Sequence, residues 1–388
     1  MDAFEIEELE RARRYHRPLY VAFGVETGLS ALLLALLAFT RFGDALYRPL
    51  RELVWWGAAP AFAGIVVVLG TLVRTPLAFW RGYLRERRWG FSTQSAGGWA
   101  VDRLKGLGIG ILLTAAVELA LVGLARALPH AWPAAAAGAA AAAVVLVSFV
   151  APVVLEPIFN RFRPLDDRAL ADDLRALAER AGVPVRDVLI ADASRRTTKL
   201  NAYVSGLART RRVVLYDTLL ERASPRQVRL IVAHELGHRR ERHVLIGTLV
   251  AAAGAVAATA AVWGALGSAA ADPRKLPVVL LVGLGFELAG LVPGSALSRR
   301  WERAADRCSL ELTGDVDGFA SVHRELARAN LADLDPPRAV YVLLFSHPTP
   351  PERIAAARTW LQTAESARAD PAVHESPKIP EGGRVRGR

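Results

Sequence analysis

The stretch Ile231-Val232-Ala233-His234-Glu235-Leu236-Gly237-His238 contains an H-E-x-x-H pattern inside a run that reads as a helix. The preceding Ser224-Pro225-Arg226-Gln227 is typical of a helix start, with an N-cap serine, a proline at the first helical position and a glutamine that closes a capping box. Residues four apart on a helix lie about 40° from each other around the axis, so His234 and His238 share a face and can bind one metal ion. Glu235 lies beside them, near any water that the ion holds. The alternative interpretation is a chance match on a charged helix.

A catalytic zinc ion takes three protein ligands and keeps a fourth position open for water, so two histidines are not sufficient. His243 lies nine residues past His234, about half a turn round a continuing helix, and we predict that it lies at the surface. Far downstream, Glu302 and Asp306 are one helical turn apart. The glutamate can then ligate the ion while the aspartate hydrogen-bonds a ligating histidine. Read alone, this segment is an ordinary solvent-exposed charged helix; paired with the first helix, it supplies the missing ligand.

The apolar residues, 52% of the 388-residue chain, are clustered into long segments. Six of these can cross roughly 30 Å of hydrocarbon at 1.5 Å per residue. These candidate spans are Leu19–Phe39, Leu53–Val73, Gly106–Leu128, Pro133–Leu155, Val244–Leu266 and Leu276–Leu297. The alanine-rich fourth segment also has the length of a buried soluble helix, and its small residues favour packing against protein over lipid.

Basic residues in the short loops indicate the orientation of the spans. Four Lys or Arg residues precede the first span and seven lie between the second and third, whereas the loops on the opposite side carry six. The N-terminus is therefore expected in the cytoplasm, and six spans return the C-terminus and the metal-binding helix to the same side. The net charge of +11 suits an anionic lipid leaflet, and no motif indicates a nucleic-acid partner. A single cysteine, Cys308, permits no internal disulfide.

A soluble region is expected between spans four and five. Asp167–Arg180 reads as an amphipathic helix, and the β-branched runs 185–191 and 212–216 predict a small strand pair before the metal-binding helix. Asn201 lies between these runs. A strand edge beside a zinc site can bind a substrate chain through its backbone, which suits a peptidase; the alternative is that Asn201 only shapes a turn.

With these residues taken together, the chain resembles the zinc CAAX prenyl protease family. Members of this family are integral-membrane metalloendopeptidases of the gluzincin type, and the chain is similar to a bacterial member. The resemblance extends over nearly the whole chain beyond the first span. It is carried by the metal-binding helix and by 88–94 (RWGFSTQ), 157–160 (PIFN), 201–203 (NAY) with Gly206, 213–220 (VVLYDTLL), Glu302 with Asp306, 346–348 (SHP) and 352–353 (ER).

The resemblance implies one Zn²⁺ per chain, held by His234, His238 and Glu302, with Glu235 as catalytic base. It also implies helices that enclose a water-filled chamber. The acidic residues Glu26, Glu118 and Glu287, which interrupt apolar spans, are expected either to face such a chamber or to pair with a neighbouring helix.

By resemblance and by their polar chemistry, His347 and Arg353 are the candidate donors to the oxyanion, and Asp306 supports a ligating histidine. Asn201 is the candidate substrate-binding residue. The expected function is hydrolysis of peptide bonds in protein or peptide substrates at a cytoplasm-facing site. Two alternatives remain open, a membrane quality-control protease of the stress-induced type and a non-catalytic membrane scaffold.

The expected fold is mainly α, a polytopic membrane bundle of about six spans with a cytoplasmic α+β zinc metalloprotease domain that spans five and six divide. The expected regions are 1–156 with four spans, 157–243 with the strand pair and zinc helix, 244–298 with spans five and six, 299–365 with the third ligand, and a disordered tail at 366–388. The expected location is the bacterial inner membrane. The sequence does not indicate an oligomeric state.

Overall fold

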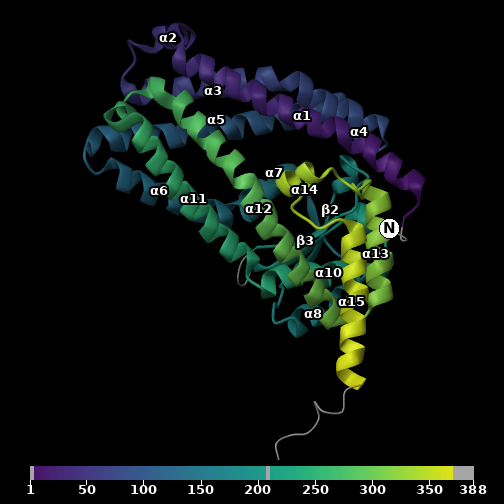
Figure 1. Cartoon of the computed structure of the whole chain (residues 1–388). Helices are drawn as coiled ribbons and strands as arrows, with labels where there is room; N and C mark the ends of the chain where they lie inside the picture. Colours follow the sequence, from purple (N-terminus) through teal and green to yellow (C-terminus); the bar gives the residue numbers. More distant parts are fainter. Residues whose placement is uncertain (1–3, 207–209, 370–388) are drawn as a thin grey trace, which may run out of the picture.

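The computed structural model describes residues 4–206 and 210–369 and is mainly helical (Figure 1). Six helical runs are long and apolar enough to cross a membrane. They are Ile6–Phe39, Trp55–Arg88, Ala96–Ala127, Trp132–Phe159, His243–Ala271 and Pro273–Thr313. Each overlaps one of the six predicted spans, so the predicted number and order of long apolar helices are confirmed.

Each of these runs contains one long helix; two of the helices are extended by a π-helical turn and two by a 3-10 turn. The helices are α1 (Ile6–Phe39), α3 (Trp55–Phe79), α5 (Ala96–Ala127), α6 (Trp132–Val150), α11 (His243–Leu266) and α12 (Leu276–Thr313). The π turns, Trp80–Leu84 and Ala151–Leu155, lead into the short helices α4 (Arg85–Arg88) and α7 (Glu156–Phe159). Within the bundle α3 packs on α5 and α6 on α11, while α12 contacts both α1 and α11 (Figure 1).

The sixth run does not end at the membrane. Helix α12 continues without a break through the boundary predicted at 298 and 299, and its second half packs against α10 (Pro225–Arg240). Glu302 and Asp306 are therefore carried on a direct extension of the sixth candidate span, which leads from the bundle to α10 in Figure 1.

A small α+β unit lies beside the bundle. Besides α10, it consists of β1 (Phe162–Pro164), α8 (Arg168–Arg180), β2 (Asp187–Ala191), β3 (Ala202–Ser205), β4 (Arg212–Tyr216), α9 (Asp217–Leu220), α13 (Val316–Asn330), α14 (Arg338–Leu344) and α15 (Pro350–Ala369). The short helix α2 (Arg41–Tyr47) belongs to the bundle. The predicted strand pair is confirmed as the parallel neighbours β2 and β4. The sheet has two further strands in the order β1-β2-β4-β3, which leaves β3 at an edge.

The core of this unit lies between the sheet and the helices α8 and α10. Leu174 and Leu177 from α8 share one buried cluster with Val213 and Leu215 of β4 and with Leu236 of α10. The start of α10 is as the sequence predicts, because the Ser224 side chain accepts from the backbone N–H of Gln227 and the Gln227 side chain accepts from the N–H of Ser224. The ligand-bearing helix is thus held rigidly against the sheet.

Helix α15 runs to Ala369, past the boundary at 365 and 366 where the tail was predicted to begin. The first four residues of the predicted tail at 366–388 therefore belong to this helix, and residues 370–388 lie outside the part of the chain that is described.

The three acidic residues inside apolar spans have different surroundings. Glu26 forms an ion pair with Arg81, with 3.2 Å between Oε2 and Nη2, so pairing with a neighbouring helix holds for this residue. Glu118 is buried, and neither of its carboxylate oxygens has a hydrogen-bond partner among the described residues. Glu287 is exposed on α12.

Candidate active site

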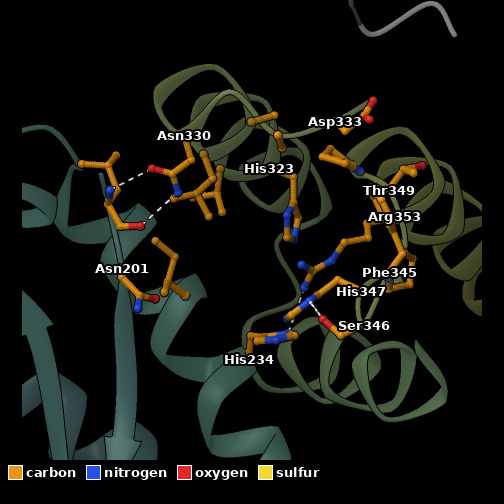
Figure 2. Close-up of a pocket in the computed structure, with 18 of the residues that line it drawn as sticks. Asn201, His234, His323, Asn330, Asp333, Phe345, Ser346, His347, Thr349 and Arg353 are labelled. Atoms are coloured by element: carbon orange, nitrogen blue, oxygen red, sulfur yellow. Dashed lines mark hydrogen bonds between the residues drawn. The ribbon is translucent and has the colours of Figure 1, made fainter. Parts of the chain in front are cut away.

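A cavity of about 520 Å³ lies between α10 and α13 (Figure 2). Residues of α1, the segment that precedes β3, the segment that follows α14 and the start of α15 also line it. Five of the predicted site residues line it, namely Asn201, His234, Glu235, His347 and Arg353. They come from four separate parts of the chain, and the fold brings them to one space.

Gly237 determines how closely the two ligand-bearing helices approach. A Cβ atom at this position would lie 2.9 Å from Cα and 3.0 Å from the carbonyl oxygen of Ala305 on α12, and also 3.0 Å from Cβ of Cys308. Two of these atoms are backbone, which cannot turn aside as a flexible side chain can. A glycine here therefore allows the contact that brings Glu302 of α12 beside the histidines of α10.

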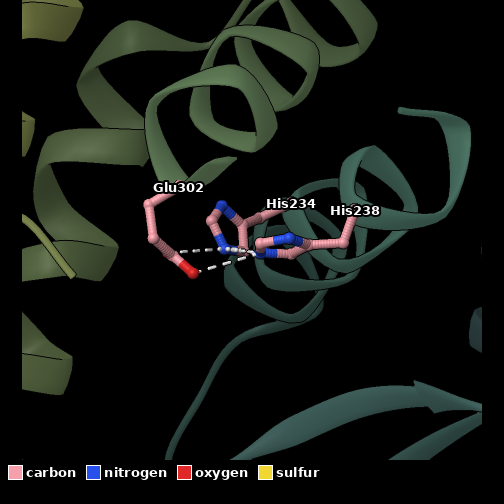
Figure 3. Close-up of side chains that lie close together, drawn as sticks. All are labelled: His234, His238 and Glu302. Atoms are coloured by element: carbon pink, nitrogen blue, oxygen red, sulfur yellow. Dashed lines mark hydrogen bonds and ion pairs between the residues drawn. The ribbon is translucent and has the colours of Figure 1, made fainter. Parts of the chain in front are cut away.

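His234, His238 and Glu302 place their ligand atoms around one point (Figure 3). The two Nε2 atoms are 3.2 Å apart, and each lies 3.3 Å from an oxygen of the Glu302 carboxylate. Zinc bonds of about 2.0 to 2.1 Å in a tetrahedron set neighbouring ligand atoms about 3.3 Å apart. The three distances in the structure match this spacing.

The chemistry of the three groups also fits a cation. Oε2 of Glu302 is buried and accepts no hydrogen bond from the described residues, although Nε2 of His234 lies 3.3 Å away. Two imidazole nitrogens and a carboxylate oxygen are common zinc ligands, and Glu302 is only 4% exposed. A divalent cation would satisfy the buried oxygen and both Nε2 lone pairs at once.

Asp306 and Arg353 hold the ring of His234 from its other side. Oδ1 of Asp306 lies 2.9 Å from Nδ1 of His234, so an N–H at Nδ1 donates to it and leaves the Nε2 lone pair facing the ligand cluster. The Arg353 guanidinium donates to both oxygens of Asp306, through Nε at 2.9 Å and through Nη2. Burial alone would lower the pKa of Arg353, but the adjacent Asp306 carboxylate raises it, so the guanidinium stays charged.

The prediction that His243 lies at the surface is wrong. His243 is 7% exposed, its Nδ1 lies 3.0 Å from Nδ1 of His238, and its ring stacks on Trp301. The prediction assumed one continuous helix, whereas α10 ends at Arg240 and Arg242 adopts a left-handed conformation with φ of 56° before α11 begins. This break turns His243 back toward the ligand cluster, and no local pattern in the sequence signals it.

Glu235 lines the cavity beside the ligand cluster, and its carboxylate makes no hydrogen bond to any described residue. Burial raises its pKa, and the nearby imidazoles of His234 and His238 oppose that effect. A carboxylate that is free of partners and has a raised pKa is suited to accept a proton.

His347 reaches the cluster from the segment that follows α14. Its Nε2 lies 3.2 Å from Oε1 of Glu302, and its Nδ1 lies 2.7 Å from the hydroxyl of Ser346 (Figure 2). The side chain is 59% exposed, so it meets the cavity from the open side. When Ser346 donates to Nδ1, the proton of the neutral ring is on Nε2 and points toward the site.

Asn201 lies across the cavity from His234 and His347 in Figure 2 and immediately precedes β3. Its backbone oxygen accepts from the N–H of Tyr216 at 3.0 Å, so the residue continues the pairing of β3 with β4. Its side chain is exposed. The neighbouring residue Leu200 is fixed by Asn330, whose side-chain amide pairs with both its backbone N–H and its C=O. Asn330 was not expected at the site from the sequence.

Two family models together match nearly the entire chain. The model of peptidase family M48 matches residues 164–361, and the model described as CAAX prenyl protease N-terminal, five membrane helices, matches residues 1–161. The chain belongs to peptidase family M48. As a member of this family it is an enzyme, a zinc metalloprotease associated with membrane-spanning helices, and the resemblance given by its motifs is confirmed.

Among curated relatives of this M48 peptidase, the metalloprotease YhfN of Bacillus subtilis is 30% identical over 323 residues, which are 80% of this chain and 75% of that protein. CAAX prenyl protease 1 of Saccharomyces cerevisiae is 29% identical over 185 residues, 47% of this chain and 41% of its own length. The matches to the prenyl proteases thus span less than half of this chain and less than half of each relative.

The fold of this M48 peptidase is similar to the crystal structure of S. mikatae Ste24p, with a TM-score of 0.75 and 21% sequence identity. The match covers 92% of this chain and 90% of that one. The helical membrane fold with its inserted α+β unit is therefore shared over nearly the full length.

Proposed function

We propose that the protein is a membrane-embedded zinc metalloendopeptidase that hydrolyses peptide bonds of protein or peptide substrates at a cytoplasm-facing site. The observation that carries the proposal is the group of His234, His238 and Glu302, whose ligand atoms all lie within 4.8 Å of one another, beside a cavity that His234 and Glu235 line. One Zn²⁺ per chain fits these three ligands. When bound, it would polarise the scissile carbonyl and lower the pKa of a water molecule.

The side chains around this point have the functional groups that peptide hydrolysis requires. Glu235 takes the proton of the attacking water and passes it to the leaving amine, which suits a carboxylate that has no hydrogen-bond partner among the described residues. Asp306 accepts from Nδ1 of His234 and Arg353 holds Asp306 in place, so both act by orienting a ligand.

Of the two candidate donors to the oxyanion, the contacts favour His347. Arg353 is committed to Asp306 by two hydrogen bonds, whereas Nε2 of His347 is directed at the ligand cluster and has Glu302 as its one polar partner in the described part of the chain. Loss of one such donor typically lowers the rate by about 10² to 10³.

The substrate is expected to lie in an extended conformation beside Asn201 and the edge strand β3. The register of β3 with β4 directs the backbone groups of Ala202 away from β4, and Ala202 lines the cavity. Backbone pairing at such an edge suits an unfolded or C-terminal segment. The names of the eukaryotic relatives and the match to the CAAX prenyl protease N-terminal model favour a substrate of the prenyl-protease type over the quality-control alternative.

The proposed location is the inner membrane of a bacterial cell, with both termini and the active site in the cytoplasm. The support is the excess of Lys and Arg before the first span and between the second and third. The lipid bilayer is therefore a partner of the chain, in addition to its peptide substrate.

The experiment that tests the catalytic assignment is Glu235→Gln. We expect the variant to bind zinc as the wild type does, because it keeps all three ligands, and to lose cleavage of a farnesylated CAAX peptide by at least about 10²-fold. Metal content is measured on the purified protein by atomic emission. Turnover that persists in a fully metal-loaded variant would contradict the role of Glu235.

The substrate class is tested by incubating the wild type with casein and with a farnesylated CAAX peptide, each with and without a zinc chelator, and by mapping the cuts with mass spectrometry. We expect chelator-sensitive cleavage of the farnesylated peptide. Cleavage of casein alone would assign the enzyme to quality control, and no chelator-sensitive cleavage of either would support a scaffold.

A further inference from the structure

One wall of the cavity is a single face of α13. Phe319, His323, Leu326, Ala327 and Asn330 recur at the three- and four-residue spacing of one helix face, and all five line the cavity. Three of them are apolar. Because the Asn330 amide is used to pair with the backbone of Leu200, His323 is the polar group of this face that is left for a ligand.

His323 is packed closely, but its nitrogens have no hydrogen-bond partner among the residues that the structure describes. The residue is only 7% exposed, and its ring packs on that of Phe319 with 4.3 Å between the centroids. It makes no hydrogen bond to any residue in 4–206 or 210–369. Figure 2 shows the ring extending from α13 into the space between Asn330 and Arg353. The ring lines the cavity, and its nitrogens are not among the buried polar atoms that lack a partner, so a ligand in the cavity can reach them.

The surroundings of His323 define what that ligand offers. Burial, and next the positive charge of Arg353, hold the pKa of His323 well below its usual range, so the ring is neutral at pH 7 and has one donor and one acceptor nitrogen. Two of the charged groups that line the cavity are already paired: Arg353 with Asp306, and Asp333 with the hydroxyl of Tyr20 at 2.5 Å. The apolar side chains of α13 can contact the apolar stem of a ligand side chain, and the His323 ring can hydrogen-bond an uncharged polar group at its end.

We propose that His323 is a specificity-determining residue, which binds a substrate side chain with an apolar stem and an uncharged hydrogen-bonding end, such as glutamine, threonine or tyrosine, near the scissile bond. This inference rests on the proposed endopeptidase function, because it assigns a side-chain preference to the same cavity. His323 does not touch the reacting atoms, so it selects substrates without taking part in the proton transfers.

The test is cleavage of a proteome-derived peptide library by the full-length protein, with the residues on each side of every cut counted by mass spectrometry. At one position the wild type is expected to favour uncharged polar side chains. His323→Leu and His323→Phe, which keep the volume but not the hydrogen bond, should lower this preference by about 5- to 10-fold in kcat/KM relative to apolar side chains. His323→Gln should retain it.

Arg324→Leu is the matched control, because it removes a polar side chain from the same helix at a position that does not line the cavity. Zinc content is measured on every variant. If His323→Leu or His323→Phe loses its zinc because it folds poorly, the other variant is used to test the proposal. An unchanged polar preference in a zinc-loaded His323→Leu or His323→Phe enzyme would overturn the proposal.

A binding measurement separates this proposal from the endopeptidase function. Glu235→Gln protein and the double variant Glu235→Gln with His323→Leu are immobilised, and the peptides that each retains from the same library are compared. If the wild type cuts nothing but the double variant loses retention of polar peptides, the subsite stands and the proposed reaction fails. Equal retention by the two proteins contradicts the subsite.

Discussion

His243 is a side chain next to the metal ligands that can determine which ring nitrogen of His238 carries the proton. Its Nδ1 and that of His238 are 3.0 Å apart, and a hydrogen bond between them requires one of the two to carry the proton. With the proton on His238, Nε2 of that ring keeps its lone pair for the metal. His243 is itself fixed by stacking on Trp301, with an angle of 17° between the rings.

We expect His243→Phe to weaken zinc binding by about 10- to 100-fold, because the ring stack is kept while the acceptor for Nδ1–H of His238 is lost. The measurement is competition for zinc against a chelator of known affinity. His130→Phe, at an exposed histidine in the loop between α5 and α6, is the control and should bind zinc as the wild type does. Equal affinity in the two variants would show that His243 has no part in orienting the ligand.

At the scale of elements, the site depends on the contact between α10 and α12. Neither helix contains a complete ligand set, and the second half of α12 brings the carboxylate to the histidines only because Gly237 lies against the backbone of Ala305. The sequence shows Gly237 inside the H-E-x-x-H pattern, but the neighbour that requires a glycine is 68 residues away and is visible only in the fold.

We expect Gly237→Ala to force these two helices apart, because the new methyl group would meet backbone atoms at 2.9 and 3.0 Å. Overpacking of this kind costs about 1 to 3 kcal/mol of stability. The variant should also lose most of its bound zinc, measured by atomic emission, since the ligand distances increase with the helix separation.

The matched control for this substitution is Gly254→Ala in α11, where a Cβ has no atom within 4 Å. This variant should keep its zinc and its thermal stability. If Gly237→Ala also kept full zinc, the close approach of α10 and α12 would not be what assembles the ligands.

At the scale of the whole molecule, the first span is tied to the catalytic region by polar contacts. Nε2 of His16 lies 2.6 Å from the carbonyl oxygen of Leu331, and the hydroxyl of Tyr20 donates to Asp333 at 2.5 Å. An ion pair joins Arg13 to Asp335. Because His16 and Tyr20 also line the cavity, the membrane region supplies part of the site wall. The bundle and the α+β unit therefore form one site together.

The proposed orientation is tested by cysteine labelling in bacterial cells. Cys308, which is buried, is first replaced by alanine to give a cysteine-free chain, and a single cysteine is then introduced at Glu179 in α8 or at His130 in the loop between α5 and α6. We expect a membrane-impermeant maleimide to label the His130→Cys protein in intact cells, and the Glu179→Cys protein only after permeabilisation. The reverse pattern would place the active site outside the cytoplasm.

Local patterns in the sequence were enough to predict the long helices and the types of residue at the site. Hydropathy over about 20 residues predicted six apolar helices, and the capping residues of Ser224–Gln227 predicted the start of α10, because both depend on residues close together in the chain. The two outer strands of the sheet were missed. β1 and β3 are three and four residues long, and pairing with neighbours rather than their own composition makes them strands.

The sequence by itself determined which residue types can hold a metal and how they are spaced on each helix, since helical periodicity is a local property. Only the tertiary structure decided how they meet. The left-handed turn at Arg242 directs His243 to His238, the contact at Gly237 brings Glu302 to both histidines, and α13 presents His323 to the cavity. Each of these depends on packing between segments that are distant in the chain or on a break that no local pattern signals, and a one-dimensional pattern contains neither.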